Sequence, residues 1–130
     1  MATKMENSLG EGFVSLALNF GTDRKATSET MDGLKKYAKQ IREVRQSQIR
    51  RYYREIKAAD LDSIVMLRPQ LAYGIGRANA GIGESSGKEL AALLEDLELI
   101  ITKLESQVQL DCFKSFMESL LAYHKMFGKN

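Results

Sequence analysis

The sequence is poor in the residues that build disulfide frameworks and metal centres. It contains one cysteine and one histidine, Cys112 and His124, and no tryptophan. A single cysteine excludes an internal disulfide and fits a reducing compartment. Because a zinc site normally needs three or four protein ligands, one thiol and one imidazole do not make one. We therefore predict no metal and no cofactor, and we expect His124 to be packed in a core.

Long apolar runs are also missing. No run approaches the roughly 20 residues that a helix needs to cross a membrane. Residues 1–19 lack a basic region followed by an apolar stretch and a cleavage site, so they do not match a secretory signal. We therefore expect the protein to remain in the cytoplasm where it is made, with no membrane partner.

The glycine clusters do not form a nucleotide-binding loop, and no group of residues forms an active site. Gly74 and Gly76 lack the third glycine of a dinucleotide-binding loop, and no strand precedes them. The segment 83–88 has the wrong spacing for a phosphate-binding loop. Cys112 and His124 would lie about 18 Å apart along one helix, too far for a nucleophile and its base. We predict no catalytic residue, and we assign the glycines to close helix approach and flexible connections.

Proline and β-branched alternation are scarce, whereas helix-forming residues are abundant. The chain has one proline, 44% apolar residues and 28% charged residues, which are ordinary values for a globular protein. A chain of 130 residues buries roughly two-thirds of its unfolded surface, which is enough for a core. We find no convincing strand. We predict an all-α fold, a compact bundle of five or six helices in a single domain over residues 1–130, with residues 1–10 frayed.

Apolar residues at steps of three and four define the predicted helices. These helices cover residues 13–20, 34–59 and 64–80, the stretch from 88 through 108, and a final stretch over 113–127. The polar segment 22–29 is predicted to be a loop, and the glycine-rich segment 81–87 a turn.

Polar residues mark where two of these helices begin. Ser28 or Thr30 is suited to cap the helix over 34–59, and Asp62 and Ser63 are suited to cap the next one. Pro69 lies several residues inside that next helix, where it predicts a kink or a local opening.

The predicted helix over 34–59 carries most of the positive charge of the chain. Nine lysines and arginines stand against two glutamates between residues 35 and 57, although the whole chain has a net charge of only +2. We call these nine cations the basic strip: Lys35, Lys36, Lys39, Arg42, Arg45, Arg50, Arg51, Arg54 and Lys57. The apolar residues between them follow the helical period and are predicted to be buried: Leu34, Tyr37, Ala38, Ile41, Val44, Ile49, Tyr52 and Ile56. Ser47 is either an ordinary residue inside this helix or the cap of a fresh start that divides it in two.

The two C-terminal helices are predicted to pack through apolar stripes. The stripe of the first runs from Leu90 to Val108, and its outer face is acidic. The residues of that acidic face are Glu89, Glu95, Asp96, Glu98 and Glu105. The predicted inward face of the final helix carries Phe113, Phe116, Met117, Leu120, Leu121, His124 and Phe127.

Several interpretations suit the basic strip. Lysines and arginines neutralise phosphates and release counterions, which gives affinity for nucleic acid without sequence preference. A basic amphipathic helix also lies on anionic membranes, but tyrosines in place of bulky aliphatic residues disfavour that. An ordinary solvated face is the simplest interpretation, whereas one-sided charge interleaved with Tyr37, Tyr52 and Tyr53 favours nucleic acid. We retain as the alternative a helical protein-interaction module that docks an acidic partner and has no RNA role.

Three segments, in this order, carry a family resemblance. They read SQIRRYY over residues 47–53, LRPQLAYGIGR over 67–77 and FKSFMESLLAYHK over 113–125. Together they resemble the small subunit of the type III-A CRISPR effector, the Csm complex, over roughly residues 44–128. The small subunit of the related Cmr complex is also a helical bundle, but we do not expect the second segment in it.

The resemblance implies a non-catalytic helical subunit of a prokaryotic ribonucleoprotein that acts in antiviral defence. Copies of such a subunit stack along the inner side of the complex and contact the backbone of the paired CRISPR RNA and target RNA. The implied partners are both RNAs, the large subunit, the repeated backbone subunits and copies of itself. Cleavage of target RNA belongs to the backbone subunit, and DNA cleavage and cyclic oligoadenylate synthesis belong to the large subunit.

Eight cations are the predicted RNA contacts. They are Arg42, Arg45, Arg50, Arg51, Arg54, Arg68, Arg77 and Lys125. Arg50, Arg51, Arg68, Arg77 and Lys125 follow from the matched segments, and the other three rest on charge alone. Opposite charge on residues 35–57 and 88–106 would also suit head-to-tail stacking of copies.

Overall fold

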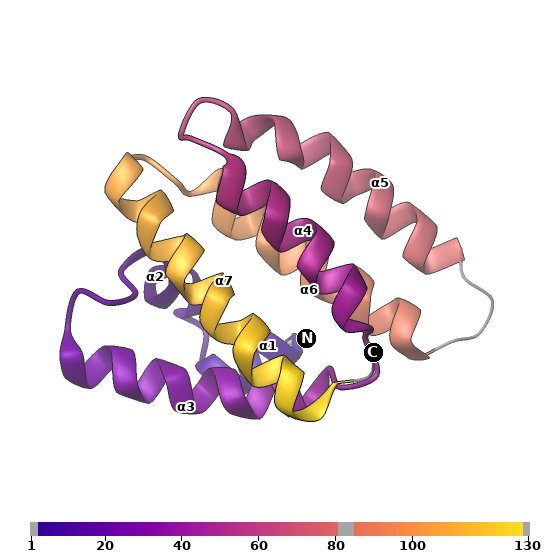
Figure 1. Ribbon diagram of the computed structural model, residues 1–130, viewed down its shortest axis with the longest axis horizontal. Coiled ribbons are helices and arrows are strands. Elements are labelled where there is room, and N and C mark those ends of the chain that lie inside the picture. Colours follow the sequence, from indigo (N-terminus) through magenta and orange to yellow (C-terminus); the bar gives the residue numbers. More distant parts are fainter. Residues whose placement is uncertain (1–2, 81–84, 129–130) are drawn as a thin grey trace.

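The computed structural model describes residues 3–80 and 85–128. This part of the chain forms seven α-helices, one 3-10 helix and no strand (Figure 1): α1 (Lys4–Leu9), α2 (Phe13–Leu18), α3 (Arg24–Gln40), α4 (Gln46–Ala58), η1 (Ile64–Met66), α5 (Leu67–Ala80), α6 (Ser85–Thr102) and α7 (Gln107–Phe127). The predicted all-α class is confirmed, but five or six helices is too few. The number differs because α1 lies in the segment predicted to be frayed and because the predicted basic helix is two helices.

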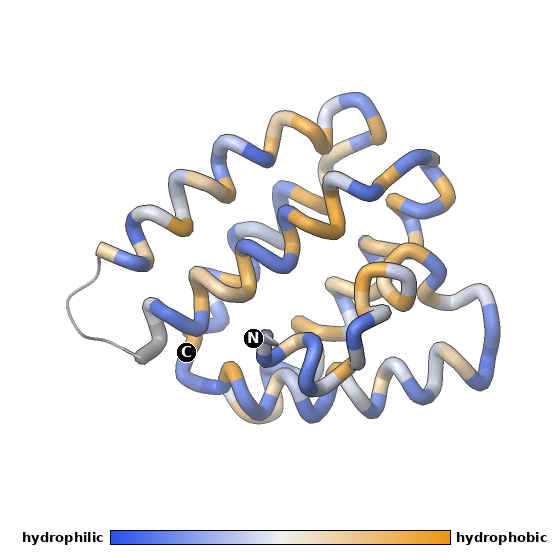
Figure 2. Tube along the Cα trace, turned by 180° about the vertical axis from the view of Figure 1, so that it is seen from behind, coloured by the Kyte–Doolittle hydropathy of each residue, from blue (hydrophilic) through white to orange (hydrophobic). Residues whose placement is uncertain are grey.

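The helices pack around one core. α5 packs on α6, whereas α3 and α4 both pack on α7, and α1 packs on α3. In Figure 1, α4 lies in front of α6 and between α5 and α7. Figure 2 shows from behind that apolar residues recur along the helices at the spacing expected of one inward face. Among residues 3–80 and 85–128, no helix is both long enough and apolar enough to span a membrane.

Helix α7 supplies the centre of the core. Phe113, Phe116, Met117 and Leu120 are completely buried on one of its faces, at the three- and four-residue steps of a helix. Burying each such side chain contributes roughly 1.5–3 kcal/mol relative to leaving it exposed. The inward face predicted for the final helix is confirmed.

The predicted basic helix is interrupted by a bend at residues 41–45, between α3 and α4. Ile41 and Val44 are buried there. His124 is also fully buried, and its Nε2 atom lies 3.3 Å from the carbonyl oxygen of Ile41. Burial disfavours the imidazolium and lowers the pKa of His124, despite hydrogen bonds to the backbone that act the other way. The prediction that His124 is a packed core residue is confirmed.

The interpretation of Ser47 as the cap of a second helix is confirmed only in part. A fresh helix does begin in this region, but its N-cap is Arg45 and not Ser47. The backbone N–H of Arg45 donates to Oε1 of Gln48 at 3.3 Å, so the side chain that closes the turn comes from inside the helix.

Helix α3 begins at Arg24, five to seven residues before the start that a cap at Ser28 or Thr30 would give. The predicted loop over 22–29 is therefore wrong from residue 24 onward, and the cap is Asp23 in place of Ser28 or Thr30. Oδ2 of Asp23 accepts a hydrogen bond from the backbone N–H of Ala26 at 2.8 Å. The first turns of α3 are exposed almost throughout, so they carry no apolar periodicity from which a helix is predicted.

The segment predicted to be frayed, residues 1–10, contains α1. Residues 1 and 2 lie outside the described part of the chain. Met5 is fully buried, and the Thr3 hydroxyl caps the helix by accepting from the N–H of Glu6 at 3.1 Å. On α3, a Cβ atom at Gly33 would lie only 2.5 Å from Cδ2 of Leu9, so this glycine lets the two helices touch. Six residues are too few to show a helical period, which is why the pattern missed α1.

The helix predicted over 64–80 is confirmed, with an irregular start. It opens as the 3-10 turn η1 and becomes α-helical at Leu67. Asp60 and Ser63 close this start, because the N–H of each donates to the side-chain oxygen of the other at 2.9 and 2.8 Å, and Asp62 is not the cap. Pro69 is the third residue of α5, where a missing N–H is tolerated because the first turn has no internal partner for it.

The C-terminal boundaries also differ from the prediction. α6 begins at Ser85, so residues 85–87 are helical and not a turn, while residues 81–84 lie outside the described part. Helix α6 ends before the predicted stripe does: residues 103–106 separate it from α7, although Leu104 still packs against the core. Val108 consequently lies in the first turn of α7 with 68% of its surface exposed, not in the core. The Ser106 hydroxyl caps this turn, accepting from the N–H of Gln109 at 3.2 Å.

Asp96 does not belong to the acidic outer face. It is 4% exposed, and its Oδ2 atom has no hydrogen-bond partner within the described residues. Burial raises the pKa of Asp96 to about 6; a hydrogen bond with Thr3 opposes this shift, and the charges of Glu6 and Glu95 add to it. The helical period predicted that the Asp96 carboxylate faces solvent, but in the structure it is buried beside the leucines of α6.

This burial predicts that stability falls as Asp96 ionises. Between about pH 4 and pH 6 the folded state holds the Asp96 proton more tightly than the unfolded chain, so the free energy of unfolding decreases as the pH rises through this window. The neutral variant Asp96→Asn should lose this decrease and exceed the wild type at neutral pH by on the order of 1 kcal/mol. Urea unfolding of both proteins across the window measures it.

The His124 contribution is present in both proteins, so the difference between them isolates Asp96. Because the pKa of His124 is lowered, its effect has the opposite sign: stability is lost as the pH falls. A difference between wild type and Asp96→Asn that does not change with pH would contradict the prediction.

Candidate nucleic-acid interface

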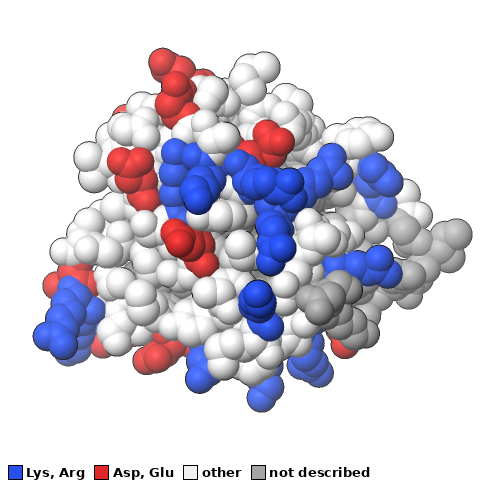
Figure 3. Space-filling model, in the orientation of Figure 1, with Lys and Arg blue, Asp and Glu red and all other residues white. Residues whose placement is uncertain are grey.

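All nine cations of the basic strip are exposed. The apolar residues predicted to oppose them are buried, except Tyr52, which is half-buried while Tyr53 is buried in its place. The strip is not continuous, because the bend at 41–45 divides it. Figure 3 shows lysines and arginines gathered over α4 and the adjoining part of α5, and a second group along the lower edge, over α3. The positive surface is therefore centred on α4 and α5.

The basic strip takes no part in the ion pairs formed among the described residues. Two ion pairs occur in that part of the chain, Lys4–Glu89 at 3.0 Å and Arg68–Glu98 at 3.7 Å. Neither contains a cation of the strip. Arg68, one of the predicted RNA contacts, is thus partly neutralised by its own chain.

Three of the predicted contacts lie around the bend. Arg42 and Arg45 are part of the bend itself, and Nη1 of Arg42 donates to the carbonyl oxygen of Lys39 at 3.1 Å. The carbonyl oxygen of Lys125, on α7, accepts from Nε2 of Gln46 at 3.5 Å. The end of α7 therefore packs beside the bend, and this brings Lys125 near Arg42 and Arg45.

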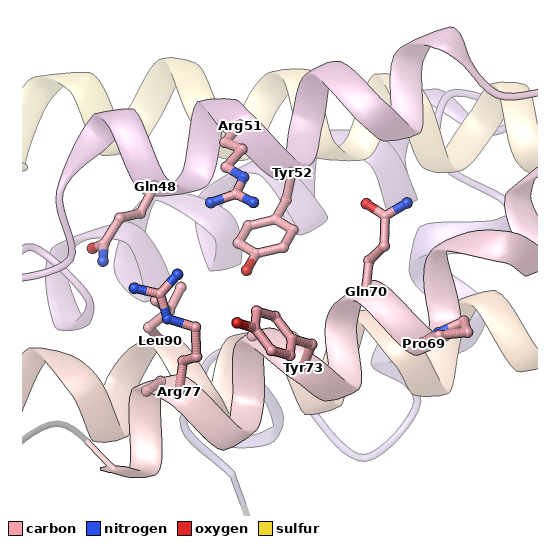
Figure 4. Close-up of a pocket in the computed structure, with 10 residues that line it drawn as sticks. Gln48, Arg51, Tyr52, Pro69, Gln70, Tyr73, Arg77 and Leu90 are labelled. Carbon is pink, nitrogen blue, oxygen red and sulfur yellow. The ribbon is translucent and has the colours of Figure 1, made fainter.

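Two further predicted contacts, Arg51 and Arg77, meet across a cleft of about 450 Å³ between α4 and α5 (Figure 4). Each guanidinium lies over a neighbouring aromatic ring, with Cζ of Arg51 5.9 Å from the ring centre of Tyr52 and Cζ of Arg77 6.0 Å from that of Tyr73. The other polar residues of the cleft are Gln48 and Gln70. Arg50 and Arg54 are exposed on α4 beside it.

The sequence prediction missed Tyr73 and both glutamines of this cleft. Tyr73 precedes Arg77 by four residues, which places the two side chains one above the other on a helix. That signal was present in the sequence. Nothing in the sequence indicated that these α5 residues face α4, since this depends on how α5 packs against the rest of the fold.

Gly74 forms the floor of the cleft. A Cβ atom there would overlap Oη of Tyr52 and lie 2.9 Å from Cδ1 of Leu94, whereas a Cβ at Gly76 would meet nothing within 4 Å. Close helix approach is thus the role of Gly74. Gly87 has the same role, because its Cβ would lie 2.7 Å from the carbonyl oxygen of Ala78 on α5.

The described residues hold no group of three or more histidine, cysteine, aspartate or glutamate side chains that would bind a metal ion. Burial raises the pKa of the Cys112 thiol, and the charge of Asp111 adds to this, so the reactive thiolate is disfavoured. The chemistry that the surface offers is recognition by guanidinium, ammonium, amide and phenol groups.

A small helical bundle with a basic face is the class that this fold and surface define. The family described as Csm2 Type III-A matches residues 24–130, and the chain belongs to this family. The resemblance seen in the sequence is confirmed and extends further towards the N-terminus. The protein is accordingly a structural subunit of the type III-A CRISPR complex. No curated protein and no solved structure matches the chain.

The two glycines of α5 should respond differently to the same substitution. Gly74→Ala should destabilise the protein by about 1–3 kcal/mol, because Tyr52 and Leu94 must move. Gly76→Ala is the matched control, and it should leave stability unchanged or raise it by up to about 1 kcal/mol, since alanine is the better helix former. Urea unfolding measures both. Equal effects would show that Gly74 has no packing role.

Proposed function

We propose that the protein is a non-catalytic subunit that binds the backbone of CRISPR RNA and target RNA without sequence specificity and supports assembly of the effector in antiviral defence. The observation that carries this proposal is the row of exposed cations over α4 and α5, of which Arg68 alone takes part in an ion pair within residues 3–80 and 85–128. The proposed contacts are Arg42, Arg45, Arg50, Arg51, Arg54, Arg68, Arg77 and Lys125. Membership of the family supports the RNA-containing context.

Backbone recognition suits a complex in which a guide strand supplies sequence choice. Base pairing between guide and target selects the sequence, so the protein needs only to recognise phosphates and helix shape. Lysines and arginines on a rigid helical surface meet that need. The proposed partners are both RNAs, the large subunit, the repeated backbone subunits and further copies of this chain, in the prokaryotic cytoplasm.

If the protein binds RNA phosphates, its affinity for RNA should fall as the salt concentration rises, and each phosphate contact should add to this dependence. Arg50→Ala should lower affinity to a similar extent for RNAs of different sequence and reduce the slope of log affinity against log salt by about one unit. Arg68→Ala should have a smaller effect, because Glu98 already neutralises part of its charge. Fluorescence anisotropy with labelled single-stranded and duplex RNA over a salt series measures this.

Arg24→Ala is the matched control for charge. It removes one exposed guanidinium from the start of α3, away from the α4–α5 surface, and should leave the slope nearly unchanged. If Arg24→Ala and Arg50→Ala have equal effects, binding follows net charge and not this surface. If the protein binds no RNA at any salt concentration, a docking surface for an acidic protein is the better interpretation.

Stacking of copies is a second part of the proposal. Of the predicted acidic face, Asp96 is buried and Glu89 is paired with Lys4. Glu95 and Glu105 are exposed, and Glu98 is partly exposed beside Arg68. These carboxylates would meet the cations of α3 on the next copy in a head-to-tail contact.

Charge reversal tests the stacking. The double variant Glu95→Lys and Glu98→Lys should lower the number of copies per reconstituted effector, because like charges would then face each other across the contact. Glu11→Lys, in the exposed loop between α1 and α2, is the control. Native mass spectrometry gives the stoichiometry, and an unchanged value for the double variant would refute this contact.

A further inference from the structure

The cleft between α4 and α5 differs from the rest of the basic surface in what lines it. Elsewhere the cations of the basic strip stand on the outside of α3 or α4 or in the bend between them. Here two guanidinium groups, two phenol rings and two side-chain amides line one hollow. Figure 4 shows Tyr52 and Tyr73 facing the space between the helices, with Arg51 and Arg77 towards one end and Gln70 towards the other. Phosphate contact alone does not call for this combination.

We propose that this cleft is a binding site for one unpaired nucleotide of RNA, with the base stacked on Tyr73. The inference rests on the proposed RNA binding and adds to it a site for the base itself. Its volume, about 450 Å³, falls within the range of roughly 300–1,000 Å³ that is usual for small-ligand sites.

Tyr73 is the residue that makes the site selective for a base. Tyr73 is 68% exposed although it is large and aromatic, so it contributes little to the core, and most of its surface is open even with the Arg77 guanidinium over the ring. Unpaired bases stack on such rings irrespective of their identity, and arginine adds a cation–π contribution. Tyr52 is fixed instead, with its hydroxyl against Gly74, and forms the opposite wall.

The remaining groups suit the other parts of a nucleotide. Arg51 and Arg77 lie at the same end of the cleft, where they would hold the phosphate. The amide of Gln70, at the other end, both donates and accepts hydrogen bonds, as the edge of any base requires. Gln48 lies on the side of the arginines, and its Oε1 atom already accepts from the backbone N–H of the N-cap residue of α4. A paired base is stacked inside its duplex and does not reach the cleft, so only an unpaired nucleotide fits. An acidic peptide would use the two arginines but not the ring of Tyr73.

The test separates base binding from phosphate binding. Binding of the full chain is measured for three probes: an oligouridine of about 10 nucleotides, an abasic oligomer with the same number of phosphates, and duplex RNA. Tyr73→Ala should lower the affinity for oligouridine by about 5- to 100-fold and change the other two by less than about twofold. Tyr73→Phe keeps the ring and should retain the affinity for oligouridine. Because Tyr73 is exposed, thermal unfolding should be the same for all three proteins.

Each other outcome overturns the site. If Tyr73→Ala binds oligouridine as the wild type does, RNA binding stands but the cleft holds no base. If it loses oligouridine and the abasic oligomer equally, the cleft holds only phosphate. If an oligoglutamate peptide binds the wild type with the same dependence on Tyr73, the cleft is a protein-docking site. If the wild type binds none of the three RNA probes, the proposed function itself fails, and the base site fails with it.

Discussion

The arrangement of the cationic surface depends on how the bend between α3 and α4 is held in the core. Ile41 and Val44 are buried there, and the carbonyl oxygen of Ile41 lies against the imidazole of His124 on α7. With the bend fixed in this way, α4 packs on α7, with α5 beyond it across the cleft. A straight helix over the same residues would leave the cations in one line and would not place α4 opposite α5.

Burial of apolar residues and exposure of charge are two sides of one constraint on α4. Ile49, Tyr53 and Ile56 lie in the core. Because they occupy the inward face of α4, the arginines between them face solvent. Such a surface is rigid because the core fixes its backbone, yet it is chemically simple, and it reads phosphates better than it reads bases. The cleft is the exception, since there a second helix brings aromatic and amide groups to the same place.

The helical class, the inward face of α7 and the exposure of the basic strip follow from periodicity alone. Periodicity fails where few residues are buried: it missed α1, with Met5 as its one buried residue, and the exposed first turns of α3. It also misplaced Asp96, because a pattern of residue types does not reveal that a short N-terminal helix covers that part of α6. Of the site, the cations were predictable from charge and resemblance. The approach of Tyr73 to Tyr52 was not, because it depends on the space that Gly74 leaves between α5 and α4.

The first two helices lie outside the stretch that the family match covers, yet they seal the interior. Phe20, just after α2, packs edge to face against Phe116 with ring centres 5.9 Å apart. A fragment trimmed to the matched stretch would lack Met5, Phe13 and Phe20, so it would expose to water the Phe116 ring and the other apolar surface that these side chains cover. The fragment would then carry an exposed apolar patch on a cationic protein, and such a patch promotes aggregation, including aggregation with RNA. Anyone defining a minimal version of this subunit should therefore keep the leading segment, however little it contributes to recognition of the family.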